Sequence, residues 1–167
     1  MSIRVLGDGA DGYRLLSPSD EILGWARGRA IGISGCANDE ATVSAAIRAY
    51  VALGAWLERQ GLHPLPTLGD DAPTFMSDGA HRWLLVGRVP VARLSEGTPY
   101  DAAAEVCSFE IVLRGFVSEG MMIHAALVAL RAAHGAMDGA DIAWSSRRGP
   151  RDRRAPVPVT HLELQGF

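Results

Sequence analysis

Short apolar runs separated by turn residues occupy the first 38 positions of the chain, and each run has the length of a strand. Glycine, proline and aspartate lie between the runs, where they favour tight turns. From residue 38 to residue 60 the apolar positions recur instead every three and four residues, as on one face of a helix. Asn38 or Asp39 can cap its start, and Gly61 ends it. We expect a helix at 38–60 and strands at 3–6, 13–16, 22–27 and 30–34.

The second half of the chain shows the same order of patterns. Strand-like runs are followed by a helical pattern that begins at Ser118, a capping residue, and reaches about residue 135. We expect strands at 82–86, 89–94 and roughly 105–114, and a last short strand at 141–144. Residues 62–80 are rich in proline, glycine and aspartate. We interpret them as a connector between two strands-plus-helix units, at 1–61 and 81–146, that together form one domain.

Residues of the two halves match at an offset of 80 positions. The matching pairs include Ile31 with Ile111, Gly35 with Gly115, and Asp39 with Glu119. The glycine at the strand-to-helix turn is the most informative match, because alanine-rich helices agree by chance. Duplication of one unit and two independent units of similar composition both remain open. Either way the predicted class is α+β, with antiparallel strands and then a helix, twice, the helices packed on the sheet and the units related by a pseudo-twofold axis.

The composition is that of a folded domain, with 48% hydrophobic and 21% charged residues in 167. All 16 basic residues are arginine. Without a lysine the chain cannot form a lysine Schiff base or complete a Walker A phosphate loop, which excludes those two classes of enzyme. Two cysteines do not make a disulfide framework, and no apolar run has the length of a membrane span. We therefore expect a cytoplasmic protein that does not associate with membranes.

Charge is divided unevenly along the chain. The net charge is −3, yet the segment 147–167 is positive, because its arginines outnumber Asp152 and Glu163. These arginines are Arg147, Arg148, Arg151, Arg153 and Arg154. Three prolines exclude a regular helix there, and we interpret the segment as a flexible or docking tail. Such a tail can pair with phosphates, although a solubilising role is commoner beside an acidic body.

Residues 7–12 read Gly-Asp-Gly-Ala-Asp-Gly, which is the spacing of a dinucleotide-binding loop. That loop has to open a helix whose N-terminus holds the pyrophosphate, whereas here a strand-like run and then a proline follow. We interpret the hexapeptide as a hairpin turn and expect no bound cofactor.

Cys107, His124 and Glu119 are weak candidates for a catalytic site. Cys107 lies on the strand before the second predicted helix, and Glu119 and His124 lie in that helix's first two turns. A helix N-terminus can activate a nearby thiol, which a histidine then assists. A lone histidine at the edge of a buried helix face is more often structural. Cys36, at the entrance of the first helix, allows the same two interpretations.

Histidines and tryptophans supply the remaining candidates. The five histidines lack zinc-binding spacing, so we expect no metal. A site assembled from His63, His81 and Asp78 would require the connector to bend these residues together. Trp25 and Trp83 lie on predicted strands, where exposed rings could stack nucleobases or an aromatic ligand. Tryptophan packs more commonly between a sheet and its helices.

Three functional hypotheses follow. The leading one is a non-catalytic module that binds a protein or a small ligand, as a homodimer formed through sheet edges or helix faces. The second is single-stranded nucleic-acid binding through the tail arginines and the strand aromatics. The order of elements resembles that of the Whirly and PUR-repeat proteins, which bind single strands, but those need a basic sheet face and this body is acidic. The third is a small enzyme that uses Cys107 and His124.

Overall fold

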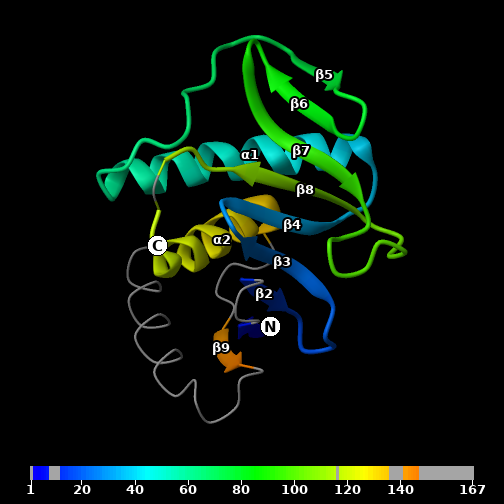
Figure 1. Cartoon of the computed structure of the whole chain (residues 1–167), viewed down its shortest axis with the longest axis vertical. Coiled ribbons are helices and arrows are strands. Elements are labelled where there is room, and N and C mark those ends of the chain that lie inside the picture. The colour runs from blue at the N-terminus through cyan, green and yellow to red at the C-terminus, as the bar shows by residue number, and fades with distance from the viewer. Residues whose placement is uncertain (1, 8–11, 116, 136–140, 147–167) are drawn as a thin grey trace.

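A nine-stranded sheet with two helices packed against one of its faces makes up the computed structural model, which describes residues 2–7, 12–115, 117–135 and 141–146 (Figure 1). The strands of the first half are β1 (Ser2–Gly7), β2 (Tyr13–Leu16), β3 (Ile22–Arg27) and β4 (Ala30–Cys36). Those of the second half are β5 (Pro73–Ser77), β6 (Arg82–Val86), β7 (Val89–Glu96), β8 (Cys107–Val112) and β9 (Asp141–Ser146). The helices are α1 (Asp39–Arg59) and α2 (Glu119–Ala133).

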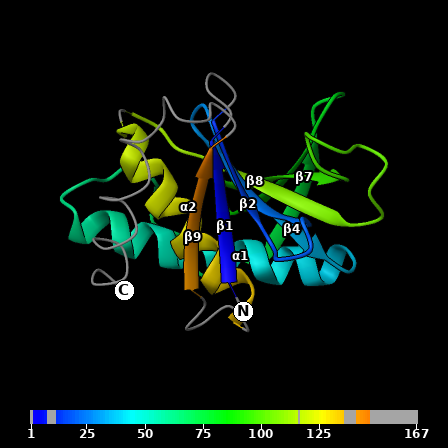
Figure 2. The same ribbon diagram turned by 90° about the horizontal axis from the view of Figure 1, so that it is seen from below.

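The strands lie in the order β5-β6-β7-β8-β4-β3-β2-β1-β9. Eight of them, β1 to β8, pair antiparallel with their neighbours, and β9 pairs in parallel with β1. The two halves of the chain therefore meet at one seam, where β4 runs beside β8 and Ile31 lies opposite Ile111. Figure 2 shows β9 beside β1 at the far end of the sheet from β7.

The α+β class and nearly every element predicted from the hydrophobic pattern are confirmed. β2, β3 and β6 have the predicted bounds, and α1 and α2 differ from the expected ranges by one or two residues at each end. The segment 62–80 is the exception. It was interpreted as a connector, but residues 73–77 form strand β5, which pairs along its whole length with β6. The strand was not predicted because the prolines and aspartates of this segment dominate the local composition and indicate a loop.

Capping and side-to-side contacts fix the two helices. The Asn38 side chain accepts a hydrogen bond from the Ala41 N–H at 2.8 Å, and Ser118 accepts one from Met121 in the same way. Arg48, halfway along α1, donates to the carbonyl groups of Ala132 and Ala133 at the end of α2. His124, near the start of α2, stacks on Trp56 near the end of α1, so the helices run antiparallel, with the end of α2 beside the middle of α1.

The sheet has two different faces because side chains alternate along each strand. Ile33, Phe109 and Leu94 lie opposite one another on adjacent strands and face the helices, where they form part of the buried core. The next position along each strand faces the other way. We call this second side, which neither α1 nor α2 covers, the open face.

Candidate interaction surface

One row of side chains crosses the open face from β2 to β5. Its members, each opposite the next in the sheet register, are Arg14, Trp25, Gly32, Glu110, Arg93, Trp83 and Met76. At its centre, one Glu110 oxygen accepts from the Trp25 indole N–H at 2.9 Å and the other pairs with the Arg93 guanidinium at 2.7 Å. These three side chains come from strands on both sides of the seam, so the row joins the two halves of the protein.

Trp25 is fully buried, yet it lies outside the core between sheet and helices. Tyr100, from the loop between β7 and β8, approaches the indole edge-on with 6.1 Å between ring centroids. The Arg14 guanidinium lies 4.7 Å from the centre of the Tyr100 ring. The loop holds its position because the buried Ser108 hydroxyl donates to the Gly97 carbonyl at 2.6 Å. Trp25 is therefore neither an exposed stacking platform nor part of the main core, the two places expected from the sequence.

Trp83 differs from Trp25 because it stays partly exposed. Its indole N–H donates to Asp78 in the β5–β6 turn at 3.1 Å, and the Arg93 guanidinium lies 5.9 Å from its ring centroid. Around it the open face of the second half is apolar. This apolar patch consists of Met76, Trp83, Leu85, Pro90 and Val112. A cleft of about 120 Å³ enters it between Trp83, Pro90 and Pro64.

The β5 edge, residues Pro73–Ser77, is the most exposed strand among β2 to β8. All five residues are exposed, and Phe75 and Met76 retain 52% and 49% of their accessible surface. Because neighbouring residues in a strand point to opposite faces, Met76 extends the apolar patch and Phe75 lies on the other side. There the Arg82 guanidinium lies 4.9 Å from the Phe75 ring centroid. β5 ends the strand order, so within the described residues its outer backbone edge has no partner strand.

A second hollow, of about 350 Å³, lies between α1 and residues 62–68. Val51 in its wall is 56% exposed, and the Tyr50 hydroxyl donates to the Pro66 carbonyl and so holds the segment against the helix. His63 lines this groove.

The candidate metal ligands do not come together. His63 lies near the C-terminal half of α1, whereas His81 lies beside Asp39 at the N-terminal end of that helix. Asp78 is engaged in its own turn, where it accepts from the His81 backbone N–H at 2.9 Å and from Trp83. In the part of the chain that the structure describes, no three histidine, cysteine or acidic side chains gather as a metal site would require.

The candidate catalytic residues are also dispersed. Cys107 lies opposite Cys36, whose thiol contacts Thr42 in the first turn of α1. His124 stacks on Trp56, with 6.1 Å between ring centroids, three to four turns further along α1 and thus roughly 20 Å away. Glu119 accepts a hydrogen bond from the Tyr13 hydroxyl at 2.7 Å. The structure therefore brings Cys107 to a second cysteine and not to His124.

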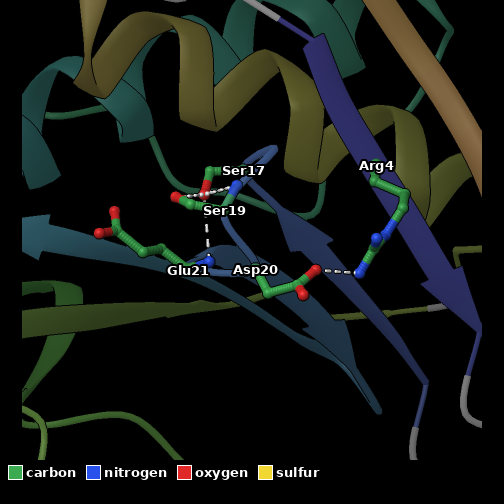
Figure 3. A network of polar contacts seen from close by, with 5 residues as sticks. All are labelled: Arg4, Ser17, Ser19, Asp20 and Glu21. Atoms are coloured by element: carbon green, nitrogen blue, oxygen red, sulfur yellow. Dashed lines mark hydrogen bonds and ion pairs between the residues drawn. The ribbon is translucent and has the colours of Figure 1, made fainter.

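Four arginines lie on the open face of the described strands, and their surroundings differ. Arg4 is paired with Asp20 in the turn between β2 and β3 (Figure 3). That turn is held by the Ser17 hydroxyl, which accepts from the backbone N–H groups of Ser19 and Glu21. Asp20 adopts a positive φ of 65° there, a conformation that aspartate tolerates better than most residues.

The tail arginines Arg147, Arg148, Arg151, Arg153 and Arg154 lie outside the described residues, as does most of the glycine-rich segment 7–12. Among the described helices, none is long and apolar enough to cross a membrane. Comparison of the chain with protein-family models, with curated proteins and with solved structures found no significant match.

Neither the β5 edge nor the cross-strand row was predicted from the sequence. Phe75 and Met76 are adjacent large apolar residues inside an otherwise polar segment, and this was the available signal for the edge. The row had no such signal, because it depends on the register between strands that lie far apart in the sequence.

Proposed function

We propose that this chain is a non-catalytic protein-binding module that takes up an extended segment of a partner as an additional strand along β5. The observation that carries the proposal is the bare edge of β5, with Phe75 and Met76 half exposed on its two faces. An apolar edge strand is a template for pairing with another chain, and proteins usually blunt it with charges or with proline. In β5 the proline, Pro73, stands at the first position and leaves the rest of the strand open. Residues 73–77 contain no charged side chain.

The two ends of the sheet support the same proposal by their difference. β1 and β5 occupy equivalent places, each four strands out from the seam. The outer edge of β1 is covered by β9, which pairs with it in parallel over six residues, from Ser2 to Gly7. This sheet therefore already accepts an added strand at one end. We propose that a partner supplies the corresponding strand at the other end.

We further propose that the halves arose by duplication and are related by a pseudo-twofold axis at the seam. The offset of 80 that equates Ile31 with Ile111 in the sequence also makes them direct neighbours across β4 and β8. A twofold axis between antiparallel strands requires this coincidence, because equivalent residues must face each other where the axis passes. The equivalence of the β1 and β5 edges rests on this relation.

The chemistry of the edge defines the partner's segment. Backbone hydrogen bonds to β5 require an extended segment, and alternate side chains of that segment would lie beside Met76 and beside Phe75. Large apolar residues fit both places, since the Met76 side continues into the apolar patch around Trp83. A small ligand fits this flat edge less well than a strand does.

The test is a selection of peptides from a random library on the full-length protein, followed by binding measurements with the selected sequences. We expect extended peptides with alternating apolar residues. Met76→Lys and Phe75→Lys should each weaken binding about tenfold or more, because each buried apolar side chain contributes about 1.5–3 kcal/mol. Hydrogen exchange at the β5 amides should slow when peptide is bound.

Val51→Lys is the matched control. It places the same charge on a similarly exposed apolar residue of α1, in the wall of the hollow beside residues 62–68, and should leave peptide affinity unchanged. Peptides that bind the wild-type protein and both β5 variants equally well would refute the proposal.

The homodimer hypothesis corresponds to a second copy as the occupant of β5. Light scattering after size exclusion distinguishes the cases. A dimer that dissociates with Met76→Lys but not with Val51→Lys would identify the partner strand as the β5 of another copy. A protein that stays monomeric at all concentrations would mean that the partner strand comes from a different protein.

Single-stranded nucleic-acid binding remains a second candidate because of the charge on the open face. Among the residues of β1 to β8 on that face, Arg4, Arg14, Arg27 and Arg93 are basic and Glu110 is acidic, and Arg4 is paired with Asp20 from the neighbouring turn. Anisotropy of a labelled single-stranded oligonucleotide tests it. Binding that weakens steeply with salt, and further when Arg27 or the tail arginines become glutamine, would favour this function over the strand proposal.

A further inference from the structure

The two cysteines of the chain are partners across the seam. Cys36, the last residue of β4, lies directly opposite Cys107, the first residue of β8, although 70 residues separate them in the sequence. Both are free thiols in this structure. The chain contains only two cysteines, and the fold places them directly opposite each other.

A β-bulge creates this pairing. Ile33 lies opposite Phe109, but three residues further along β4 Cys36 lies opposite Cys107, only two residues before Phe109. The extra residue is accommodated at Gly35, which adopts a φ of 82°. Without the bulge, Cys36 would point to the open face, away from Cys107. Instead both thiols lie on the helix face, under the first turn of α1.

The spacing of the pair suits a disulfide. Directly opposed residues in antiparallel strands have Cα atoms about 4.5 or 5.5 Å apart, depending on the hydrogen-bonding pattern. Disulfides require about 4.4–6.8 Å. An opposed pair such as Cys36 and Cys107 is therefore within reach of a disulfide.

The two thiols differ in access. Cys36 is 3% exposed, and burial, with a smaller contribution from the neighbouring Cys107, raises the pKa of its thiol. Cys107 is partly exposed. An incoming reagent can therefore reach Cys107 directly, whereas Cys36 in the folded structure can react only after Cys107, with the bond that Cys107 has formed. This is the arrangement of an attacking and a resolving cysteine.

We infer that Cys36 and Cys107 form a redox-active dithiol that closes into an internal disulfide by exchange with a small disulfide such as oxidised glutathione. The Cys107 thiolate attacks one sulfur of the reagent, a mixed disulfide forms and one glutathione thiolate leaves. Cys36 then loses its proton to solvent and attacks the Cys107 sulfur, which releases the second glutathione. The two protein thiols lose two electrons, and oxidised glutathione gains them as two reduced molecules.

The experiment incubates the folded full-length protein with glutathione at a series of oxidised-to-reduced ratios, quenches with acid and alkylates the remaining thiols. Intact mass spectrometry should show conversion to a monomer that has lost two hydrogen atoms and takes up no alkylating reagent. The fraction converted should follow the ratio, as an equilibrium with the buffer requires.

Two variants separate the roles of the cysteines. Cys36→Ser should stop at one glutathione on Cys107. Cys107→Ser should react about tenfold or more slowly, because the buried Cys36 thiol is reached only when the structure opens locally. Circular dichroism checks that both variants are folded.

Other results would overturn the inference. These are wild-type protein that accumulates glutathione on its cysteines without an internal disulfide, a disulfide that joins two chains, and an internal disulfide that forms only in denaturant.

Discussion

The indole ring of Trp25 lies so close to the backbone of Gly32 that a Cβ atom at position 32 would come within 1.8 Å of the ring. The two residues are direct partners on β3 and β4, and Gly32 is in turn opposite Glu110, which accepts the indole hydrogen bond. Because Gly32 has no side chain, the Trp25 ring can lie across β4, and its indole N–H reaches Glu110 on β8.

Gly32→Ala should destabilise the protein strongly. The ring cannot move aside easily because it is fully buried between Gly32 and Tyr100. Overpacking of this kind costs about 3 kcal/mol. Urea unfolding followed by tryptophan fluorescence measures it, and a loss below about 1 kcal/mol would mean that the ring has another place to go.

Gly54→Ala should have the opposite effect, and it serves as the control for the same chemical change. Gly54 lies inside α1, and a Cβ atom there meets nothing within 4 Å. Alanine in a helix interior is more stable than glycine by about 0.5–1 kcal/mol, because glycine loses more backbone freedom on folding. The same urea experiment should show a higher midpoint, and a lower one would contradict the open surroundings of this position.

Glu110 should be sensitive to charge and to hydrogen bonding separately. Glu110→Gln keeps an acceptor for the Trp25 indole but removes the ion pair with Arg93, which is largely shielded from solvent, and should cost about 1–2 kcal/mol. Glu110→Ala also leaves the buried indole N–H without its acceptor, and should cost about 1–3 kcal/mol more.

Unfolding free energies of the two Glu110 variants provide the measurement. Equal losses would show that the indole hydrogen bond contributes nothing beyond the ion pair.

The elements of this fold were predictable because their hydrophobic periods are local. The α1 pattern from Val43 to Leu57 and the caps at Asn38 and Ser118 need only neighbouring residues to be recognised. β5 was missed because it is short and its edge position leaves it without a buried face, which is the feature that an alternating pattern reports.

The site contacts were not predictable, since they depend on register. Trp25 reaches Glu110 across an intervening strand, and Cys36 meets Cys107 only because a bulge at Gly35 shifts the pairing. A one-residue change in register would send each side chain to the other face. Cys107 and His124 were weak candidates for one site because they lie on consecutive predicted elements, which says little about distance across a sheet.

Tyr50 provides a test at alkaline pH. Burial raises the pKa of its hydroxyl from 10.0 to about 12, and Arg114 offsets part of this effect. A hydroxyl that holds its proton more tightly when folded stabilises the protein fully below the unfolded pKa, and this contribution is lost as the pH rises from 10 towards 12. We expect the wild-type protein to lose about 1 kcal/mol from this group between about pH 9 and pH 11.

Tyr50→Phe separates this contribution from the rest of the titration. The variant should cost about 1 kcal/mol at neutral pH, because the hydrogen bond to the Pro66 carbonyl is lost, and the difference from wild type should shrink above about pH 10. The chain is well suited to the measurement, since it has no lysine and only two other tyrosines, and its two cysteines titrate in the same way in both proteins. Unfolding free energies of the two proteins that stay parallel through the alkaline range would mean that Tyr50 ionises as freely in the folded state as in the unfolded chain.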